Sequence, residues 1–425
     1  MNTKRRVCPA GKEAVLFLLL SIVLALTGLG IHAAASQRKE ETDMPEITLV
    51  VATDLHYLAS ELTDHGAYFE AMIGSSDGKV MEYIDELTDA FLSEVIARKP
   101  DALILSGDLS FNGARVSHEA LAGKLRAVSD AGIPVLVIPG NHDLDSDAAA
   151  GFRGDGFTRV ESVTPEEFAA IYYEDGLSKA VARDGASLSY VAEICPALRV
   201  LMLDVNTADS PNRVGEETLS WIEDQLRDAS AAGAKVIGVS HQNLYRHNPV
   251  IYQGYVIENA DALLSLYEEY GVLLNLSGHL HCQHIVKEEL SEIATSSLAV
   301  NPCQYGVITL ADGTLAYETI PVDVAAWAAA RGSTNPDLLD FPAYAEDFFL
   351  RSGRTPVRGD DPDAEALSRF FGEVNRLYFA GRLDLLDKDD PGFDRWSDSF
   401  GFEEQYILAI REEAGLDSTR LTLRY

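Results

Sequence analysis

Short runs of Val, Ile and Leu alternate along the chain with amphipathic segments, and this alternation restricts the fold more than any other feature. Six runs carry almost no polar residues: 47–52, 102–105, 135–138, 200–203, 236–239 and 273–276. Such runs are typical of strands that are covered on both faces. Segments with helical spacing lie between them, including 82–98, 117–131 and 216–229. The pattern predicts an α/β domain built from layers of sheet and helix.

Five of these runs end in residues that can bind metal ions. In chain order these residues are Asp54, His56, Asp108, Asn141, His241, His279 and His281. Ligands bind at the carboxyl edge of the strands in open α/β sheets, so these side chains are expected to meet there. Two carboxylates, one amide and four imidazoles suit Mn, Fe or Zn better than a thiolate site or a calcium cage does. With water, seven ligands are enough to hold two ions.

The order of these residues forms a recognisable pattern. It reads Asp-x-His, Gly-Asp, Gly-Asn-His-Asp, His and Gly-His-x-His. Over residues 46–320 this pattern resembles the calcineurin-like metallophosphoesterases. The resemblance implies a layered metallophosphoesterase β-sandwich that is flanked by helices.

The resemblance also implies a role for each metal-competent residue. Three side chains are implied to hold a first ion: Asp54, His56 and His281. Three more are implied to hold a second ion: Asn141, His241 and His279. Asp108 would bridge the two divalent or trivalent ions, and the metal would be Mn, Fe or Zn. Two such ions, about 3.5 to 4 Å apart, lower the pKa of water and stabilise both oxygens of an in-line displacement.

Two further expectations concern the loops beside these ligands. By the same resemblance, His142 donates to the phosphoryl or leaving-group oxygen and Asp143 orients it. An extended backbone would send His279 and His281 to one side, towards different ions, and would turn Leu280 into the protein.

Three regions are predicted along the chain. Residues 1–36 carry early basic residues, an apolar run over 14–31 and small residues at 33–35, which predicts either a cleaved signal peptide or an uncleaved membrane anchor. Residues 45–323 form the predicted catalytic domain. Residues 324–425 are predicted to be a small helical domain, with its clearest helix at 363–379. The protein is therefore expected to be exported, either secreted or attached to the outer face of the cytoplasmic membrane, and only the N-terminal segment would contact the membrane.

Charge and composition narrow the choice of substrate. The 34 basic and 67 acidic residues create a field that repels long nucleic acids. The export segment, the run Gly-His-Leu-His-Cys-Gln and the helical tail resemble exported bacterial phosphodiesterases related to class III cyclic nucleotide phosphodiesterases. We therefore expect a dinuclear metal-dependent phosphodiesterase that hydrolyses small nucleotides, cyclic nucleotides among the candidates, outside the cytoplasm. A phosphomonoesterase or nucleotidase, and a non-enzymatic surface protein on the same fold, are the alternatives.

The preference for diesters depends on how few cations lie near the motifs. Only Arg115 and Arg246 lie close to the motifs in sequence, whereas a dianionic monoester rewards additional cationic donors. Tyrosines in neighbouring loops are candidates for stacking a base: Tyr57, Tyr245 and Tyr255.

Overall fold

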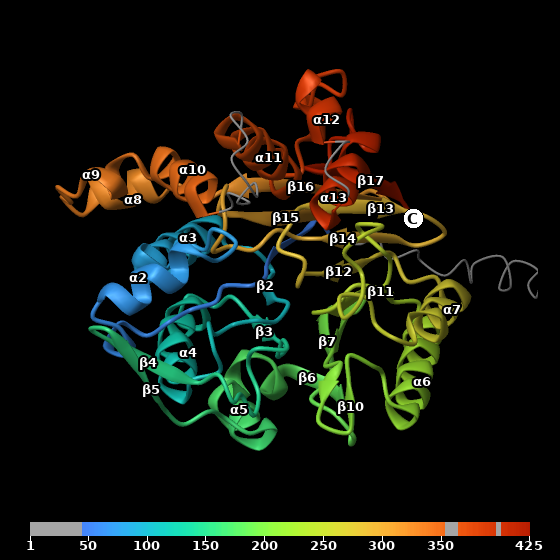
Figure 1. Cartoon of the computed structure of the whole chain (residues 1–425). Helices are drawn as coiled ribbons and strands as arrows, with labels where there is room; N and C mark the ends of the chain where they lie inside the picture. The colour runs from blue at the N-terminus through green and yellow to red at the C-terminus, as the bar shows by residue number, and fades with distance from the viewer. Residues whose placement is uncertain (1–44, 353–363, 397–400) are drawn as a thin grey trace, which may run out of the picture. The chain divides into compact units, whose positions relative to one another are not determined.

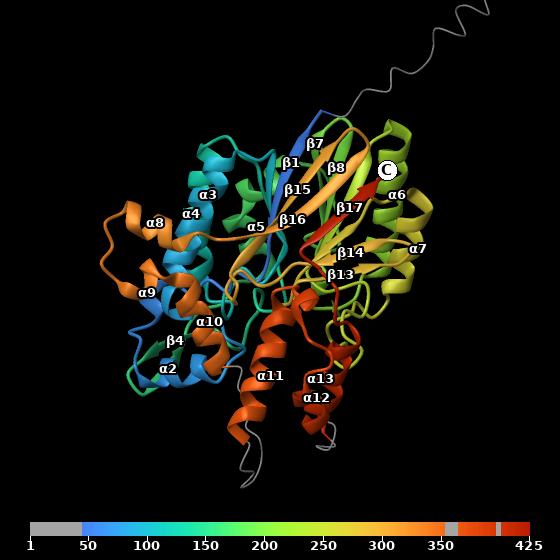
Figure 2. The same cartoon turned by 90° about the horizontal axis from the view of Figure 1, so that it is seen from above.

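Two mixed β-sheets form the centre of the molecule, and helices cover their outer faces (Figures 1 and 2). The computed structural model describes residues 45–352, 364–396 and 401–425. The strands of the first sheet follow the order β17-β16-β15-β1-β2-β3, and those of the second the order β13-β14-β12-β11-β8-β7-β6. The layered β-sandwich flanked by helices is therefore confirmed.

Each sheet combines a parallel centre with antiparallel additions. In the first sheet β1 (Ile47–Ala52), β2 (Ala102–Leu105) and β3 (Val135–Val137) are parallel, while β15 (Gln304–Ala311), β16 (Thr314–Pro321) and β17 (Arg420–Arg424) are antiparallel. In the second sheet the parallel strands are β8 (Leu198–Leu203), β11 (Lys235–Ser240), β12 (Asn275–Ser277) and β14 (Ser291–Ala294). Antiparallel strands complete it: β6 (Ala180–Arg183), β7 (Tyr190–Cys195) and β13 (His284–Lys287).

Amphipathic helices cover both sheets. The first sheet packs against α3 (Ile84–Arg98) and α4 (Arg115–Asp130), and the second against α6 (Glu216–Ala232) and α7 (Ala260–Tyr270). Along β1, Val50 and Ala52 join the core under α3 and α4, whereas the alternate residues Leu49 and Val51 are fully buried on the opposite face. Burial of both faces explains why these strands carry uninterrupted apolar runs.

Smaller elements lie outside the two sheets. They are α2 (Ala67–Gly74), α5 (Pro165–Ile171), the hairpin β4 (Ala150–Arg153) with β5 (Gly156–Arg159), and the hairpin β9 (Asn206–Thr207) with β10 (Ser210–Pro211).

The C-terminal region is helical up to its last strand. Its helices are α8 (Val324–Ala330), α9 (Pro336–Leu339), α10 (Phe341–Ser352), α11 (Ala364–Phe379), α12 (Pro391–Trp396) and α13 (Phe402–Glu412). Phe341 and Phe348 extend the core of the first sheet, whereas α11 to α13 enclose Leu280 and Cys282 in a separate apolar cluster.

The chain then returns to the first sheet as β17, which pairs with β16. The predicted helical segment did not include this strand. Its alternating sequence, Arg-Leu-Thr-Leu-Arg, suits an edge strand with Leu421 buried.

The predicted export segment, residues 1–36, lies outside the described residues. Within the described ranges, none of the helices combines the length and the apolar character needed to cross a membrane. The three cysteines in these ranges, Cys195, Cys282 and Cys303, are unpaired.

Candidate metal centre

The ends of β1, β2, β11 and β12 bring carboxylates and imidazoles into two adjoining groups. One group contains Asp54, His56, Asp108 and His281, and the other contains Asp108, His241 and His279. In each group the potential ligand atoms lie within 4.8 Å of one another. Asp108 belongs to both groups, which is the geometry that a bridging ligand needs.

The first group converges on one oxygen of Asp54. Its Oδ1 lies 3.2 Å from Nε2 of His281 and 3.7 Å from Nε2 of His56, and these two nitrogens lie 3.0 Å apart. Oδ1 is buried and has no hydrogen-bond donor among the described residues. Burial of a carboxylate oxygen without a donor is costly, and a cation at this point would be contacted by that oxygen and by both imidazole nitrogens. The residues therefore fit a cation.

The second group includes the predicted amide ligand. Nε2 of His241 lies 3.4 Å from Oδ2 of Asp108 and 3.1 Å from Oδ1 of Asn141. The ring of His279 packs edge-on to that of His241, with 4.9 Å between centroids. The structure thus brings together all seven residues that the sequence predicted as ligands. Oxygen and nitrogen donors of this kind suit Mn, Fe or Zn.

Hydrogen bonds behind the imidazoles fix their orientation. Nδ1 of His241 lies 3.0 Å from the Ser106 carbonyl oxygen, and Nε2 of His279 lies 3.1 Å from the Gly254 carbonyl oxygen. Nδ1 of His281 contacts Oδ2 of Asp77 at 2.5 Å. In a neutral imidazole, an acceptor on one ring nitrogen holds the proton there, so the other nitrogen can bind a metal once its own proton is displaced. Sequence reasoning missed Asp77, because it follows no strand and belongs to no motif.

The electrostatics of the cluster favour positive charge. Burial opposes ionisation of Asp108, but the neighbouring imidazoles, above all His241, together outweigh burial and hold the pKa of Asp108 well below its usual range. Burial likewise opposes protonation of His241 and His281, but nearby carboxylates raise the pKa of each to about 9. The pKa of His279 falls to about 4 because of burial and the charge of His241. The carboxylates therefore stay ionised and draw cations to the site.

The ligand residues adopt an unusual backbone conformation. Five of them have positive φ: Asp54 at 50°, His56 at 45°, Asp108 at 46°, His279 at 66° and His281 at 60°. The expected extended backbone at His279 and His281 is therefore wrong, although both rings reach the site and Leu280 is buried as expected. Left-handed conformations are strained for residues other than glycine and cluster at functional sites.

Two motif glycines allow the ligand loops to approach one another. A Cβ at Gly140 would lie 2.2 Å from Oδ1 of Asp108, and one at Gly278 would lie 2.0 Å from Oγ1 of Thr53. A larger residue at either position would push a ligand loop away from its neighbour.

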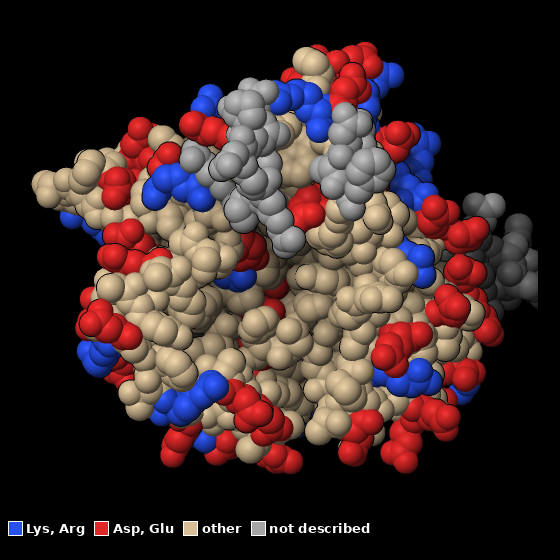
Figure 3. All heavy atoms as spheres, in the orientation of Figure 1, with Lys and Arg blue, Asp and Glu red and all other residues tan. Residues whose placement is uncertain are grey.

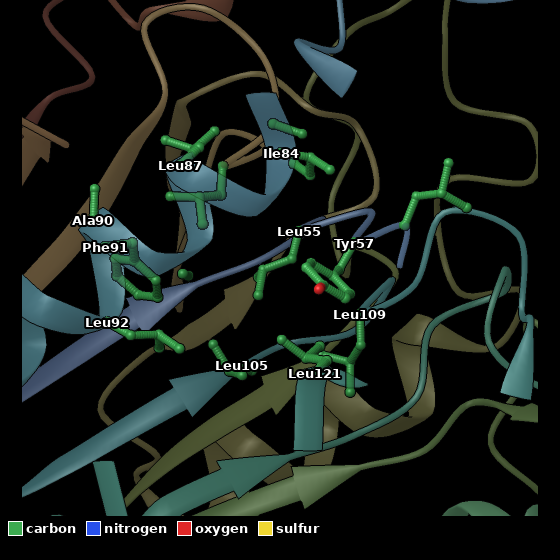
Figure 4. Close-up of a cluster of buried hydrophobic side chains, with 14 of the residues drawn as sticks. Leu55, Tyr57, Ile84, Leu87, Ala90, Phe91, Leu92, Leu105, Leu109 and Leu121 are labelled. Atoms are coloured by element: carbon green, nitrogen blue, oxygen red, sulfur yellow. The ribbon is translucent and has the colours of Figure 1, made fainter. Parts of the chain in front are cut away.

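Apolar side chains alternate with the ligands and hold their loops in the core. Leu55, Tyr57 and Leu109 point into the cluster formed with α3 and α4 (Figure 4). The Tyr57 hydroxyl donates to Asp85 at 2.7 Å. Tyr57 therefore supports the Asp54 and His56 loop, and the expectation that it stacks a base is wrong.

His142 lies at the exposed side of the cluster. Its backbone N–H donates to Oδ1 of Asp108 at 2.9 Å, and its Nε2 lies 3.9 Å from Oδ2 of the same residue. The side chain is 46% exposed, so its ring can meet a substrate that approaches from solvent.

The structure places Asp143 differently from the prediction. Its buried carboxylate accepts hydrogen bonds from the backbone N–H groups of Leu109, Ser110 and Gly140 at 2.8 to 3.0 Å, and from the Ser110 hydroxyl. These bonds tie the Asp108 loop to the Asn141 loop. Asp143 therefore organises the backbone of both loops. Its carboxylate makes these bonds in place of the expected bond that would orient the His142 ring.

The expected shortage of cations near the site is also wrong. A cavity of about 610 Å³ adjoins His56 and His142, and Lys79 and Arg159 both line it. The two arginines named from the sequence are engaged elsewhere, because Arg115 pairs with Glu161 and Glu167, and Arg246 stacks on Tyr252. Figure 3 shows the face of the molecule hollowed near its centre, with acidic and basic atoms in the hollow.

Comparisons with known proteins agree with this geometry. Residues 47–283 match the calcineurin-like phosphoesterase family, and residues 323–417 match the C-terminal domain of cyclic nucleotide phosphodiesterase. The sequence matches no curated protein.

Solved structures with a similar arrangement share little sequence. A dimetal phosphatase from Danio rerio is 13% identical, with a TM-score of 0.48 over 64% of this chain and 95% of that chain. The anchor protein GAP50 from the inner membrane complex of Plasmodium is 12% identical, with a TM-score of 0.38 over 65% of this chain and 85% of that chain. Both TM-scores lie below 0.5, so the assignment depends on the family match, which spans more than half of the 425 residues. The chain belongs to the calcineurin-like phosphoesterase family.

Proposed function

We propose that the protein is a metal-dependent phosphodiesterase that hydrolyses small nucleotides, including cyclic nucleotides, outside the cytoplasm. The observation that carries this proposal is the match of residues 323–417 to the C-terminal domain of cyclic nucleotide phosphodiesterase. Helices of that region pack directly against the loop that carries two of the candidate ligands. Leu280 lies in the same apolar cluster as Phe371 and Tyr378, and the Gln283 N–H donates to the Phe379 carbonyl oxygen at 3.0 Å.

The charge around the site supports a diester. Lys79 is ion-paired with Asp77 at 2.7 Å, and Asp147 lines the cavity together with Lys79 and Arg159. Much of the local positive charge is therefore balanced by carboxylates. A diester carries one negative charge and needs fewer cationic donors than a dianionic monoester.

The chain's own residues supply positioning and a proton. Asp54 and Asp108 would hold the metal ions, and hydrogen bonds to Ser106, Gly254 and Asp77 fix the imidazoles of His241, His279 and His281. Two bound ions would polarise a phosphoryl oxygen and lower the pKa of water. Hydrolysis adds water across one P–O bond, so a new P–O bond forms from water while the departing alcohol oxygen takes a proton. His142 is placed to donate that proton, because its ring is exposed beside Asp108.

A second candidate, a phosphomonoesterase or nucleotidase, is favoured by one observation. Lys79 and Arg159 line the cavity beside His142 and could meet the second charge of a monoester. The test compares bis(4-nitrophenyl) phosphate with 4-nitrophenyl phosphate, and a 3′,5′-cyclic nucleotide with its 5′-monophosphate, at equal metal loading. We expect a higher kcat/KM for both diesters. A consistently higher value for the monoesters would support the second candidate instead.

The cellular location is a separate part of the proposal. The basic start and the apolar run within residues 1–36 support export. Protease added to intact cells should digest the protein if it lies on the outer face, and the culture medium should contain it if it is released. If the added protease leaves the protein intact and the protein is found in the cytoplasmic fraction, export is contradicted.

A further inference from the structure

The cavity beside the metal-binding groups is strongly aromatic. His56 and His142 line it where it meets the cluster, and four aromatic residues form its walls: Tyr68, Phe111, Phe152 and Phe157. Its volume of about 610 Å³ falls in the range of small-molecule sites. One cavity thus joins the proposed proton donor to a set of flat apolar surfaces.

Three of these four aromatic walls come from two segments that lie outside both sheets, whereas Phe111 lies in the loop between β2 and α4. Tyr68 belongs to α2, whereas Phe152 and Phe157 belong to the hairpin β4–β5. These segments are bonded to each other. The Tyr68 N–H donates to the Gly154 carbonyl oxygen at 3.0 Å, and the Gly154 N–H donates to the carboxylate of Asp64 at 3.0 to 3.1 Å.

Close packing strengthens this connection. A Cβ at Gly66 would lie 2.7 Å from the backbone of Gly154, so the start of α2 sits directly on the turn of the hairpin. Arg153 also donates to the Glu61 carbonyl oxygen at 2.9 Å. The aromatic walls are therefore preformed, which lowers the ordering cost of binding a ligand between them.

Two of the aromatic rings remain accessible to solvent. Tyr68 is 37% exposed and Phe157 is 48% exposed, although their centroids lie only 5.6 Å apart. Tyr68 is also nearly parallel to Phe152, with an interplanar angle of 15° and 6.3 Å between centroids. Paired aromatic surfaces left open beside a polar catalytic centre are typical of a binding site.

We propose that this aromatic cavity binds the nucleobase of the substrate while the phosphate lies at the metal-binding groups. This proposal rests on the proposed function, because it assumes that the phosphorus atom reacts beside His142. A nucleobase suits the cavity because its flat faces stack on aromatic rings in a manner that tolerates different bases. Arg159, whose guanidinium lies 5.4 Å from the centroid of Phe157, adds a positive charge at the same wall.

The test uses matched substrates with and without a base. Adenosine 3′,5′-cyclic phosphate is paired with the corresponding cyclic phosphate of 1-O-methylribose, and adenosine 5′-monophosphate with 1-O-methylribose 5-phosphate. The quantity measured is the ratio of kcat/KM within each pair. For the wild type we expect the base to raise kcat/KM by about 5- to 100-fold, mainly through a lower KM.

Variants then locate the origin of that preference. Phe157→Ala should bring the ratio close to one, and Phe157→Leu should give an intermediate ratio, because leucine restores apolar volume without a flat ring. Tyr173→Ala is the matched control, since Tyr173 is 45% exposed but lines a different cavity. Tyr173→Ala should leave the ratio unchanged.

The outcomes separate this inference from the proposed function. A wild-type ratio near one, or an unchanged ratio in Phe157→Ala, would overturn the nucleobase site. Stronger cleavage of a long-chain alkyl phosphodiester than of any nucleotide would also overturn it. If the monophosphate pair is preferred but still shows the base effect, the diesterase proposal fails and the nucleobase site stands.

Discussion

The metal-binding cluster and the aromatic cavity adjoin each other but are built in different ways. The cluster is placed by strand ends of both sheets, and its carboxylates are almost fully buried. The cavity is placed by α2 and the hairpin β4–β5, which belong to neither sheet, and two of its aromatic rings are more than a third exposed. In the proposed function, the sheets position the groups that carry out the chemistry, whereas the surface segments select the substrate.

The two regions also differ in backbone strain. Left-handed backbone at residues other than glycine costs on the order of 1–3 kcal/mol each, and five cluster ligands adopt it. Such strain persists only where the surrounding structure fixes the chain. Three aromatic walls of the cavity, Tyr68, Phe152 and Phe157, lie in a regular helix and hairpin, and none of them has a positive φ. Substitutions in the cluster should therefore have larger effects than substitutions in the cavity.

The largest effect is expected for Asp108→Ala, because Asp108 belongs to both metal-binding groups. Loss of its carboxylate should weaken both ions and lower kcat by at least about 10⁴-fold, since most of the rate enhancement depends on the metals. Metal content by mass spectrometry and kcat on a diester check this together. Full activity with two ions bound would show that the cluster is not the catalytic centre.

A smaller effect is expected for His142→Ala. The variant should keep its metals, because His142 contacts the cluster mainly through its backbone N–H, while kcat falls by about 10²- to 10⁴-fold with the loss of a proton donor. A substrate with a good leaving group, such as bis(4-nitrophenyl) phosphate, should lose less activity than a cyclic nucleotide, because 4-nitrophenolate leaves without a proton. Equal losses on both substrates, or loss of metal, would assign His142 a structural role.

The smallest effect in the cluster is expected for Asp77, which acts on the metal through His281. Asp77→Ala should weaken metal binding by about 10- to 100-fold, which is typical for loss of a hydrogen bond behind a metal-binding histidine. Asp77→Asn keeps an acceptor oxygen and should restore most of the affinity. Metal titration of both variants tests this, and identical affinities in Asp77→Ala and the wild type would exclude a positioning role.

The parts that could be predicted from sequence are those in which local pattern and burial agree. A strand forms at each of the six predicted apolar runs, although β12 (Asn275–Ser277) begins two residues later than predicted, and the helices α3, α4, α6 and α11 form where the apolar patterns placed them. The antiparallel strands β15 and β16, which lie inside the first sheet, were not predicted; in β16, polar residues such as Glu318 alternate with buried ones and interrupt the apolar pattern. The turn that joins these two strands could have been predicted, because the pair Asp312-Gly313 favours a two-residue hairpin turn. Both residues have positive φ in the structure.

In the candidate metal centre, too, only residues within a local pattern could be predicted from the sequence. The seven ligand residues were predictable because each follows a buried strand within a short motif. Asp77 and the aromatic residues of the cavity follow no such rule, because only the tertiary structure brings α2, the hairpin and the ligand loops together. Tyr255, which was named as a base-stacking candidate, packs against His279 with 4.7 Å between ring centroids, and its role in stacking a base stays a prediction.

Because Cys282 is buried, its reactivity can report local opening of the C-terminal helices that cover it. Burial raises the pKa of the Cys282 thiol to about 12, and burial raises that of Cys303 as well, so neither forms much reactive thiolate near neutral pH. Cys195 is partly accessible, so among the described cysteines it should react first with a maleimide. Helices α11 to α13 cover Cys282 next to Leu280. The rate at which Cys282 is alkylated would therefore report how often these helices separate from the loop that carries His279 and His281. Alkylation followed by mass spectrometry could thus measure local opening around this loop without an engineered label.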